Sequence, residues 1–316
     1  MFANTNVLIT GCQGFVGTAI AKDLMAKGAH VIALVKDQNR KSFLKAGGNL
    51  SVVYGDIRDR EVIRYCLSKY EAHYVIHLAA QPIVRICHND PYTAYMTNAI
   101  GTLNVVEEIR NLVKKPLKVV CISSDKAYGP APVPYTEDTP YAVFDSYCTS
   151  KLCADAIGLS YARTYDLPIV MVRAGNIYGP GDLNTSRLIP RSILRMLDGL
   201  SPVLYSGVAD YCREFIYIGN IVNAFSTLLE KGVPGEAYNI GGTEPQRILD
   251  VITSLRDKIN PEIEIDIVEK EFDEIETQYL SADKLMALGW KPEVSLDEGL
   301  DNTIEWCRGY RESRGW

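Results

Sequence analysis

The sequence has no run of lysine or arginine, and its 316 residues carry a formal net charge of −6. A protein that binds nucleic acid would normally present a basic surface, so this class is disfavoured. There is also no apolar run close to the ~20 residues that cross a bilayer. Residues 1–6 are too few and too polar for a signal peptide. We therefore expect a soluble, cytoplasmic protein with neither a nucleic-acid nor a membrane partner.

No two of the eight cysteines have the C-x-x-C spacing that is typical of metal sites. Disulfides are rare in cytoplasmic proteins, so a disulfide framework is not expected either. We expect no metal site, and we interpret most of the cysteines as small, buried apolar residues. Cys148 is set apart because it directly follows a candidate catalytic tyrosine.

Short apolar segments alternate with helical patterns through the first half of the chain. This alternation predicts βαβ units and a parallel sheet covered on both faces, which is the Rossmann-type doubly wound α/β fold. The expected strands are 6–10, 31–35, 50–54, 74–78, 118–123 and 169–173, and the expected helices are 16–27, 61–69, 94–113 and 146–165.

Beyond Arg173 the pattern becomes less regular, with glycine and proline in NIYGPGD and GLSP. Residues 214–231 return to a strand followed by a helix. We therefore expect a dinucleotide-binding domain formed by 1–173 plus 214–237, and a smaller, interleaved α/β substrate lobe formed by 174–213 plus 238–316. In that lobe the expected helices are 249–259, 282–288 and 296–308, and the expected strand is 264–268.

Three glycines, Gly11, Gly14 and Gly17, lie between the first expected strand and the first expected helix. In this setting the first allows a tight turn, the second lets the backbone approach a pyrophosphate, and the third permits close helix–sheet packing. The helix start supplies free N–H groups for phosphate. A glycine triplet alone is weak evidence, but the strand–turn–helix context predicts a dinucleotide site. The residues expected to bind the cofactor here also include Gln13, Phe15 and Val16.

The end of the second expected strand indicates which dinucleotide is bound. An acidic residue there favours NAD, whereas neutral and basic residues favour NADP. The expected acidic position is Val35, and Lys36 and Arg40 are placed to hold a 2′-phosphate. We therefore favour NADP, although Asp37 keeps NAD open if the register is shifted by two.

Two later strand ends contribute further cofactor contacts. Asp56 is expected to accept a hydrogen bond from the adenine amino group, with Ile57 beside it. At the end of the fourth strand, Leu78 and the small residues Ala79 and Ala80 leave room for the cofactor. The preceding His77 is interpreted as a structural strand histidine.

Tyr147 and Lys151 are spaced i and i+4 on the expected helix 146–165, so they share one face. An ammonium next to a phenol favours the phenolate and lowers the phenol pKa from its usual ~10. The tyrosine can then take a hydroxyl proton as hydride leaves the adjoining carbon, and Lys151 can also hold the nicotinamide ribose. Ser124, at a strand end, can hydrogen-bond the same substrate hydroxyl.

These motifs resemble the short-chain dehydrogenase/reductase family in its extended, nucleotide-sugar branch. The resemblance covers essentially the whole chain through TGCQGFVG, GDIRD, HLAAQ, NAIGTLNV, SSDKAYG, YCTSK, RAGNIYGPGD, REFIYIGNIVNA, YNIGG and LGWKP. It implies that Ser124, Tyr147 and Lys151 are a catalytic trio. It also implies a nucleoside-diphosphate sugar as substrate, contacted by Gln81, Asn176, Tyr205 and Arg213. Arg187 is a further candidate for the diphosphate, although a solvated arginine at a helix start explains it equally well. The helices 94–113 and 146–165 resemble the pair that forms the homodimer interface in this family, so we expect a homodimer.

Asp125 and Lys126 narrow the reaction class. In the dTDP-glucose 4,6-dehydratases of this family the corresponding pair is Asp–Glu; the aspartate protonates the leaving hydroxyl and the glutamate takes the C5 proton. The Ser-Asp-Lys version most resembles CDP-glucose 4,6-dehydratases and UDP-N-acetylglucosamine dehydratases. An ammonium is not a base, so Lys126 would act either as a neutral amine or by stabilising an enolate. Adjacent residues of an extended chain point to opposite sides, which leaves open whether one of the two is only structural. Cys148 is a weaker candidate proton carrier.

The sequence therefore predicts an NADP-dependent nucleotide-sugar dehydratase that oxidises the hexose at C4 and eliminates water across C5 and C6. UDP-N-acetylglucosamine and CDP-glucose are the leading substrates. The alternatives are a nucleotide-sugar 4-epimerase or reductase and, more remotely, a non-catalytic cofactor-sensing protein.

Overall fold

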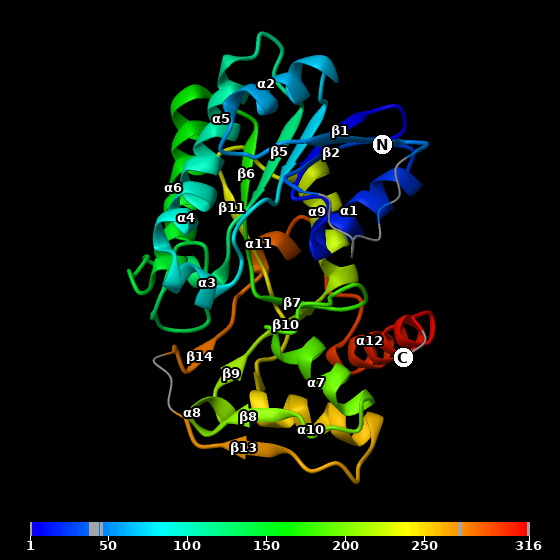
Figure 1. The fold of residues 1–316 in the computed structure, drawn as a ribbon. Helices are drawn as coiled ribbons and strands as arrows, with labels where there is room; N and C mark the ends of the chain where they lie inside the picture. Colours follow the sequence, from blue (N-terminus) through cyan, green and yellow to red (C-terminus); the bar gives the residue numbers. More distant parts are fainter. Residues whose placement is uncertain (1, 38–43, 45–46, 271–273, 315–316) are drawn as a thin grey trace.

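The computed structural model of the chain describes residues 2–37, 44, 47–270 and 274–314 (Figure 1). Seven strands form one sheet in the order β11-β6-β5-β4-β1-β2-β3, and every neighbouring pair is parallel. They are β1 (Asn6–Thr10), β2 (His30–Val35), β3 (Leu50–Tyr54), β4 (Tyr74–His77), β5 (Lys118–Ile122), β6 (Ile169–Ala174) and β11 (Ala237–Ile240). The predicted doubly wound α/β fold is thus confirmed.

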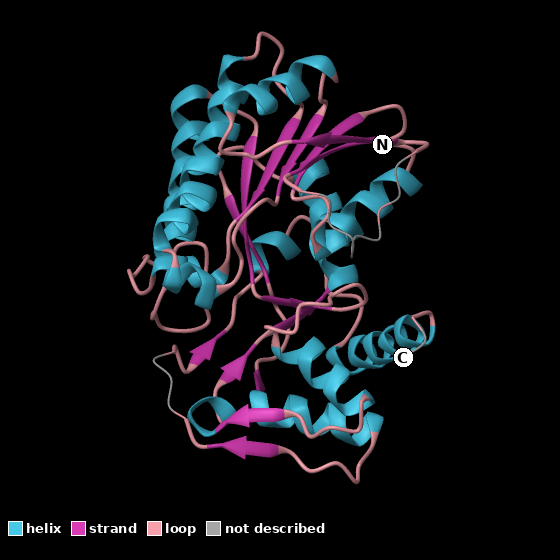
Figure 2. Cartoon of the chain, viewed as in Figure 1, coloured by secondary structure: helices cyan, strands magenta, loops and turns pink. Residues whose placement is uncertain are grey.

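Helices cover both faces of this sheet, which is why its strands are almost continuously apolar (Figure 2). One hydrophobic core forms between the sheet and α1 (Phe15–Ala26) and α9 (Ile218–Lys231). A second core forms on the other face, against α2 (Arg60–Lys69), α5 (Gly101–Asn111) and α6 (Ser146–Tyr165).

The helix predicted over 94–113 is present, but it contains a π-helical turn. The chain forms a short helix α3 (Val84–Asn89), then α4 (Pro91–Tyr95), a π-helical turn η1 (Met96–Ile100) and finally α5. Within the π turn, the Asn98 side chain accepts a hydrogen bond from the Gln81 backbone at 2.7 Å and donates one to the Ser150 hydroxyl at 2.9 Å. These contacts to distant segments account for a turn that the local pattern does not predict.

A third hydrophobic core lies below the sheet in Figure 1, among α7 (Leu188–Leu197), α10 (Ile248–Ile259) and α12 (Leu296–Glu312). Helix α7 was not predicted, α12 extends beyond 308, and the helix expected at 282–288 is shorter, α11 (Asp283–Met286). Short strands connect this region: β7 (Asn176–Tyr178) pairs with β10 (Phe215–Tyr217), β8 (Val203–Tyr205) with β13 (Asp266–Val268), and β9 (Cys212–Arg213) with both β12 (Gln246–Arg247) and β14 (Thr277–Gln278). The division of the chain into the two domains at the expected boundaries stays a prediction.

Six of the eight cysteines are buried, and all eight are free thiols. Their interpretation as small apolar residues is therefore confirmed for most of them. None of the helices in the described part of the chain combines the length and the apolar character that spanning a bilayer would need.

Candidate active site

A cavity of about 1430 Å³ lies at the carboxyl ends of the sheet strands and is lined by residues from both halves of the chain. Gly11 follows β1, Ala79 follows β4, and Ser124 follows β5, so three strand ends open into it. Ligands of doubly wound sheets bind at this edge. Tyr205, Arg213 and other residues from below the sheet line the opposite wall.

The glycine loop has the shape that a dinucleotide phosphate needs. Gly11 has φ +70°, and a Cβ there would lie 2.8 Å from the Ala79 nitrogen. A Cβ at Gly17 would lie 2.4 Å from the Gly11 oxygen, so helix α1 approaches the loop this closely only because Gly17 lacks a Cβ. Gly14 is the N-cap of α1 and lines the cavity. The free N–H groups at this helix start therefore face a space that a pyrophosphate can occupy.

Most of the residues predicted to bind the cofactor line this cavity. They are Gly11, Gly14, Phe15, Val16, Lys36, Asp56, Ile57, Leu78, Ala79 and Ala80. Gln13 is not among the lining residues, and Arg40 lies outside the described residues.

The Asp56 carboxylate is already engaged by cations of its own chain. Arg58 donates to it from Nη2 at 2.7 Å, and the Lys36 Nζ lies 3.6 Å from the same oxygen. The hydrogen bond from Arg58 holds the pKa of Asp56 below its usual range. Arg58 does not itself line the cavity, and its contact with Asp56 was not predicted; its place two residues after Asp56 in GDIRD was the available signal.

His77 is enclosed by hydroxyl groups. Its Nδ1 lies 2.7 Å from the Thr10 hydroxyl, and its Nε2 lies 3.0 Å from the Thr102 hydroxyl. Burial lowers its pKa to about 3, so the ring is neutral. These contacts join β1, β4 and α5, which fits the structural role that was predicted.

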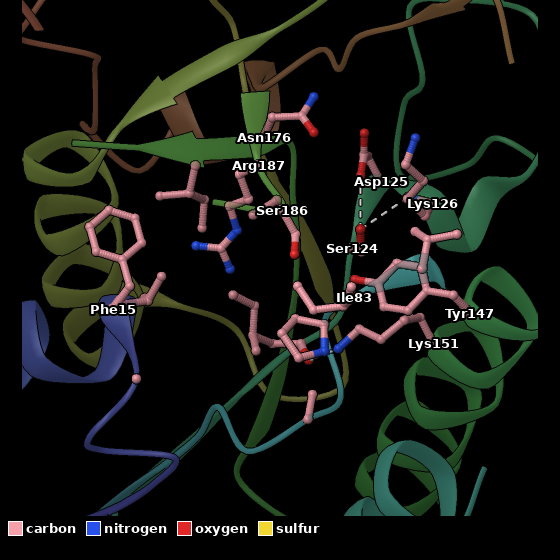
Figure 3. A pocket seen from close by; sticks show the side chains of 18 of the residues that line it. Phe15, Ile83, Ser124, Asp125, Lys126, Tyr147, Lys151, Asn176, Ser186 and Arg187 are labelled. Atoms are coloured by element: carbon pink, nitrogen blue, oxygen red, sulfur yellow. Dashed lines mark hydrogen bonds between the residues drawn. The ribbon is translucent and has the colours of Figure 1, made fainter. Parts of the chain in front are cut away.

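The predicted trio meets at the cavity wall (Figure 3). The ring of Tyr147 points toward Ser124, and Lys151 lies beneath it, one helical turn along α6. The Lys151 Nζ donates to the Ile122 carbonyl at 3.0 Å. All three side chains line the cavity, so the structure brings Ser124, which follows β5, together with Tyr147 and Lys151 of α6.

The expected lowering of the Tyr147 pKa is not found. Burial raises the pKa of Tyr147 above its ordinary value, and the hydrogen bond between Tyr147 and Ser124 only partly opposes this. Burial also lowers the pKa of Lys151 to about 8, while the nearby Asp155 acts in the opposite direction. The prediction was wrong because it considered only the charge of the lysine and not the desolvation of both groups.

Asp125 and Lys126 both line the cavity, and Figure 3 shows them on the same side of Ser124. The expectation of opposite sides does not hold, because the chain leaves β5 in a 3₁₀ turn, η2 (Asp125–Tyr128), rather than in an extended conformation. The Ser124 hydroxyl donates to the Asp125 carboxylate at 2.8 Å and accepts from the Lys126 backbone N–H at 3.2 Å. The Lys126 Nζ donates to Oε1 of Gln278.

Cys148 is a poor proton carrier in this arrangement. It is buried, and burial raises the pKa of its thiol to about 12. Its backbone N–H is bonded by the Asp145 side chain, the cap of α6, so the residue belongs to the start of the helix.

Four of the five predicted substrate contacts line the cavity: Asn176, Arg187, Tyr205 and Arg213. The fifth, Gln81, is not a lining residue; its side-chain oxygen accepts a hydrogen bond from the Ile83 backbone at 3.3 Å. Arg191 and Lys270 also line the cavity but were not predicted. Arg191 could have been found from its spacing of four residues after Arg187, the N-cap residue of α7, which places the two on one side of the helix start.

A buried ion pair links the elements that carry the site residues. Arg173, near the end of β6, donates to Asp155 of α6 at 2.7 Å, and neither side chain is more than 3% exposed. Arg173 also donates to the Tyr128 hydroxyl at 2.7 Å, and Tyr128 donates to Asn239 at 2.8 Å. The pair therefore connects the helix of Lys151 with the turn that carries Asp125. Sequence reasoning missed it because no local spacing relates these residues.

Residues 8–303 match the family described as GDP-mannose 4,6 dehydratase. The chain belongs to the GDP-mannose 4,6 dehydratase family. Among curated members, dTDP-glucose 4,6-dehydratase 1 of Escherichia coli is 30% identical, over 95% of this chain and 92% of its own length. A trifunctional UDP-glucose 4,6-dehydratase, 3,5-epimerase and reductase of Arabidopsis thaliana is 29% identical over 98% of this chain, which spans only 48% of that relative.

Solved structures of similar fold include both dehydratases and epimerases. The dTDP-glucose 4,6-dehydratase DesIV of Streptomyces venezuelae, with NAD and TYD bound, has a TM-score of 0.89 and 28% identity, and covers 99% of this chain and 98% of its own. UDP-glucose 4-epimerase of Thermotoga maritima, with UDP-glucose, has a TM-score of 0.90 and 27% identity, and covers 97% and 99%. The overall fold of the GDP-mannose 4,6 dehydratase family therefore does not separate these two reactions. Within the described residues, no group of three metal-ligating side chains is placed to hold an ion.

Proposed function

We propose that this protein is a nucleotide-sugar dehydratase that oxidises the hexose at C4 and eliminates water across C5 and C6. The observation that carries the proposal is the placement of Asp125 and Lys126 in the cavity wall beside Ser124 and Tyr147. Oxidation of a hydroxyl uses only the trio, whereas loss of water also requires an acid at the leaving oxygen. The curated dehydratase relatives agree with this assignment.

The first half-reaction removes a proton from O4 and hydride from C4. A nicotinamide dinucleotide held at the glycine loop and by Lys151 would supply the acceptor for this hydride. Tyr147 takes the O4 proton, Ser124 orients the hydroxyl, and Lys151 assists the proton transfer and holds the nicotinamide ribose. The low pKa of Lys151, about 8, lets this group gain and lose a proton near neutral pH.

The second half-reaction uses the ketone at C4, which acidifies the C5 proton. Asp125 donates its proton to O6 as the C6–O6 bond breaks, so that oxygen leaves as water. Lys126 assists loss of the C5 proton, either as an amine base or by stabilising the developing enolate. Hydride returned to C6, with a proton at C5, would give the 4-keto-6-deoxy sugar; release before that step would give the 5,6-unsaturated ketone and leave the hydride on the dinucleotide.

The choice of cofactor is a separate part of the proposal. We infer NADP because the buried Val35 occupies the expected acidic position and Lys36 lines the cavity. The DesIV structure with NAD argues for the other cofactor. Dissociation constants of NADP and NAD, measured for the wild type and for Lys36→Ala, decide the question. Tighter binding of NAD by the wild type would refute the inference.

UDP-N-acetylglucosamine and CDP-glucose remain the proposed substrates, and the dTDP-glucose relatives add dTDP-glucose to the panel that must be tested. The ring of Tyr205 and the Lys270 Nζ, 5.1 Å from its centroid, form the part of the cavity wall proposed for the nucleoside. The homodimer and the cytoplasmic location expected from the sequence stay predictions.

Incubation with each nucleotide sugar, followed by mass spectrometry, tests the function. Loss of one water, or of one water and two hydrogens if the unsaturated ketone is released, supports a dehydratase; an unchanged mass with inverted C4 favours an epimerase, the rival that the Thermotoga structure represents. Asp125→Asn should abolish water loss and spare C4 oxidation. Normal dehydration by that variant would refute the role of Asp125, and full activity of Tyr147→Phe would favour a non-catalytic protein.

A further inference from the structure

The Lys126 side chain is held from a distant part of the chain. Its Nζ donates a hydrogen bond to Oε1 of Gln278, which lies 152 residues later, in β14. An ammonium or amine can only donate to the amide here if the amide presents its oxygen, so this contact fixes the orientation of the Gln278 side chain. Gln278 is fully buried, and water therefore does not compete for that oxygen.

The backbone around Gln278 is fixed on both sides. Strand β14 pairs with β9 so that Gln278 lies opposite Arg213, the predicted diphosphate contact. Arg213 donates from Nη1 to the Glu276 carbonyl at 2.9 Å. Two residues after Gln278, the Leu280 N–H donates to the buried Glu214 carboxylate at 3.2 Å. The amide oxygen is thus presented from a rigid segment that also contacts the cation expected at the diphosphate.

We propose that Gln278 is a positioning residue for the loss of water, because its amide oxygen holds Lys126 in the cavity wall beside Asp125. This inference rests on the function proposed above. A lysine side chain has several rotatable bonds and would otherwise populate many rotamers. Once held, the Lys126 amine has one position in the cavity wall, so its step depends on the amide. Oxidation at C4, which uses Ser124, Tyr147 and Lys151, does not depend on the Gln278 amide.

The first test compares the two half-reactions in variants of Gln278. Gln278→Leu removes the acceptor, and we expect kcat for water loss to fall about tenfold, with KM and the extent of C4 oxidation unchanged. Gln278→Glu keeps an acceptor and should restore most of the rate. Gln246→Leu, in β12 at the other edge of the same small sheet, is the matched control and should behave as wild type.

A double variant then decides whether Gln278 acts through Lys126. If it does, Lys126→Met combined with Gln278→Leu loses water no more slowly than Lys126→Met alone. Additive losses, or equal losses of C4 oxidation and water loss in Gln278→Leu, would overturn the inference.

A second test needs no activity. The rate at which an amine-specific reagent labels Lys126 in the substrate-free protein is measured by peptide mass spectrometry. Gln278→Leu should raise this rate about tenfold, because the hydrogen bond no longer holds the amine, and should leave other lysines unchanged. An unchanged rate would overturn the inference. If the wild-type protein dehydrates no nucleotide sugar, the proposed function is refuted. The labelling rates would still show whether Gln278 holds the Lys126 amine.

Discussion

The ion pair between Arg173 and Asp155 allows the sharpest prediction about stability. Asp155 is fully buried and Arg173 is 3% exposed, so replacing Asp155 by Asn leaves a guanidinium without its counter-charge in the interior. Breaking a buried pair in this way costs about 3–5 kcal/mol. Asn keeps one oxygen acceptor for Arg173, so we expect about 3 kcal/mol of the free energy of unfolding to be lost.

The assay is urea unfolding at neutral pH, with Glu236→Gln as the control. Glu236 pairs with Lys284 at the same 2.7 Å, but both side chains are a third or more exposed. An exposed pair of this kind contributes only about 0–1 kcal/mol. The two variants therefore separate the effect of burial from the effect of the ion pair itself.

A second variant keeps the reasoning open to refutation if Asp155→Asn does not fold. Replacing both partners by apolar residues, Asp155→Leu with Arg173→Met, removes the buried charges together and should recover most of the lost stability. If Asp155→Asn costs no more than Glu236→Gln, or if the double variant is less stable than the single one, the desolvation argument fails. Asp155→Asn should also move the pKa of Lys151 further below about 8, because Asp155 acts to raise it.

Three further predictions follow from single residues. Burial raises the pKa of Glu214 from 4.5 to about 7. Because the pKa is higher in the folded state, the stability that protonated Glu214 contributes is fully present below about pH 4.5 and is lost as the pH rises through 7. Stability curves should therefore show Glu214→Gln gaining about 3 kcal/mol on the wild type between pH 4.5 and 8, and a pH-independent difference would contradict this. Gly17→Ala places a Cβ 2.4 Å from the Gly11 oxygen, so dinucleotide affinity measured by calorimetry should fall at least about tenfold; unchanged affinity would show that the loop does not need this approach. Tyr147→Phe should slow C4 oxidation by about 10²–10⁴ in single turnovers while the dissociation constant of the dinucleotide stays near that of the wild type; rapid oxidation would exclude Tyr147 as the base.

Local sequence determined the parts of this protein that depend on short-range spacing. The alternation of apolar strands with helices predicts the parallel sheet, because each strand must be covered on both faces. Gly11, Gly14 and Gly17 predict the phosphate loop, and the i, i+4 spacing predicts that Tyr147 and Lys151 share a face of α6. These features are set within one turn of helix or one βα unit, so they can be recognised without a fold.

Only the tertiary structure decided how these parts act on one another. The Tyr147 pKa is raised rather than lowered because desolvation depends on what packs around the ring. Asp125 and Lys126 share a side because the chain turns into a 3₁₀ helix after β5. The contact of Lys126 with Gln278 crosses 152 residues. Burial and long-range contacts of this kind arise from the packing of distant segments, which no local spacing encodes.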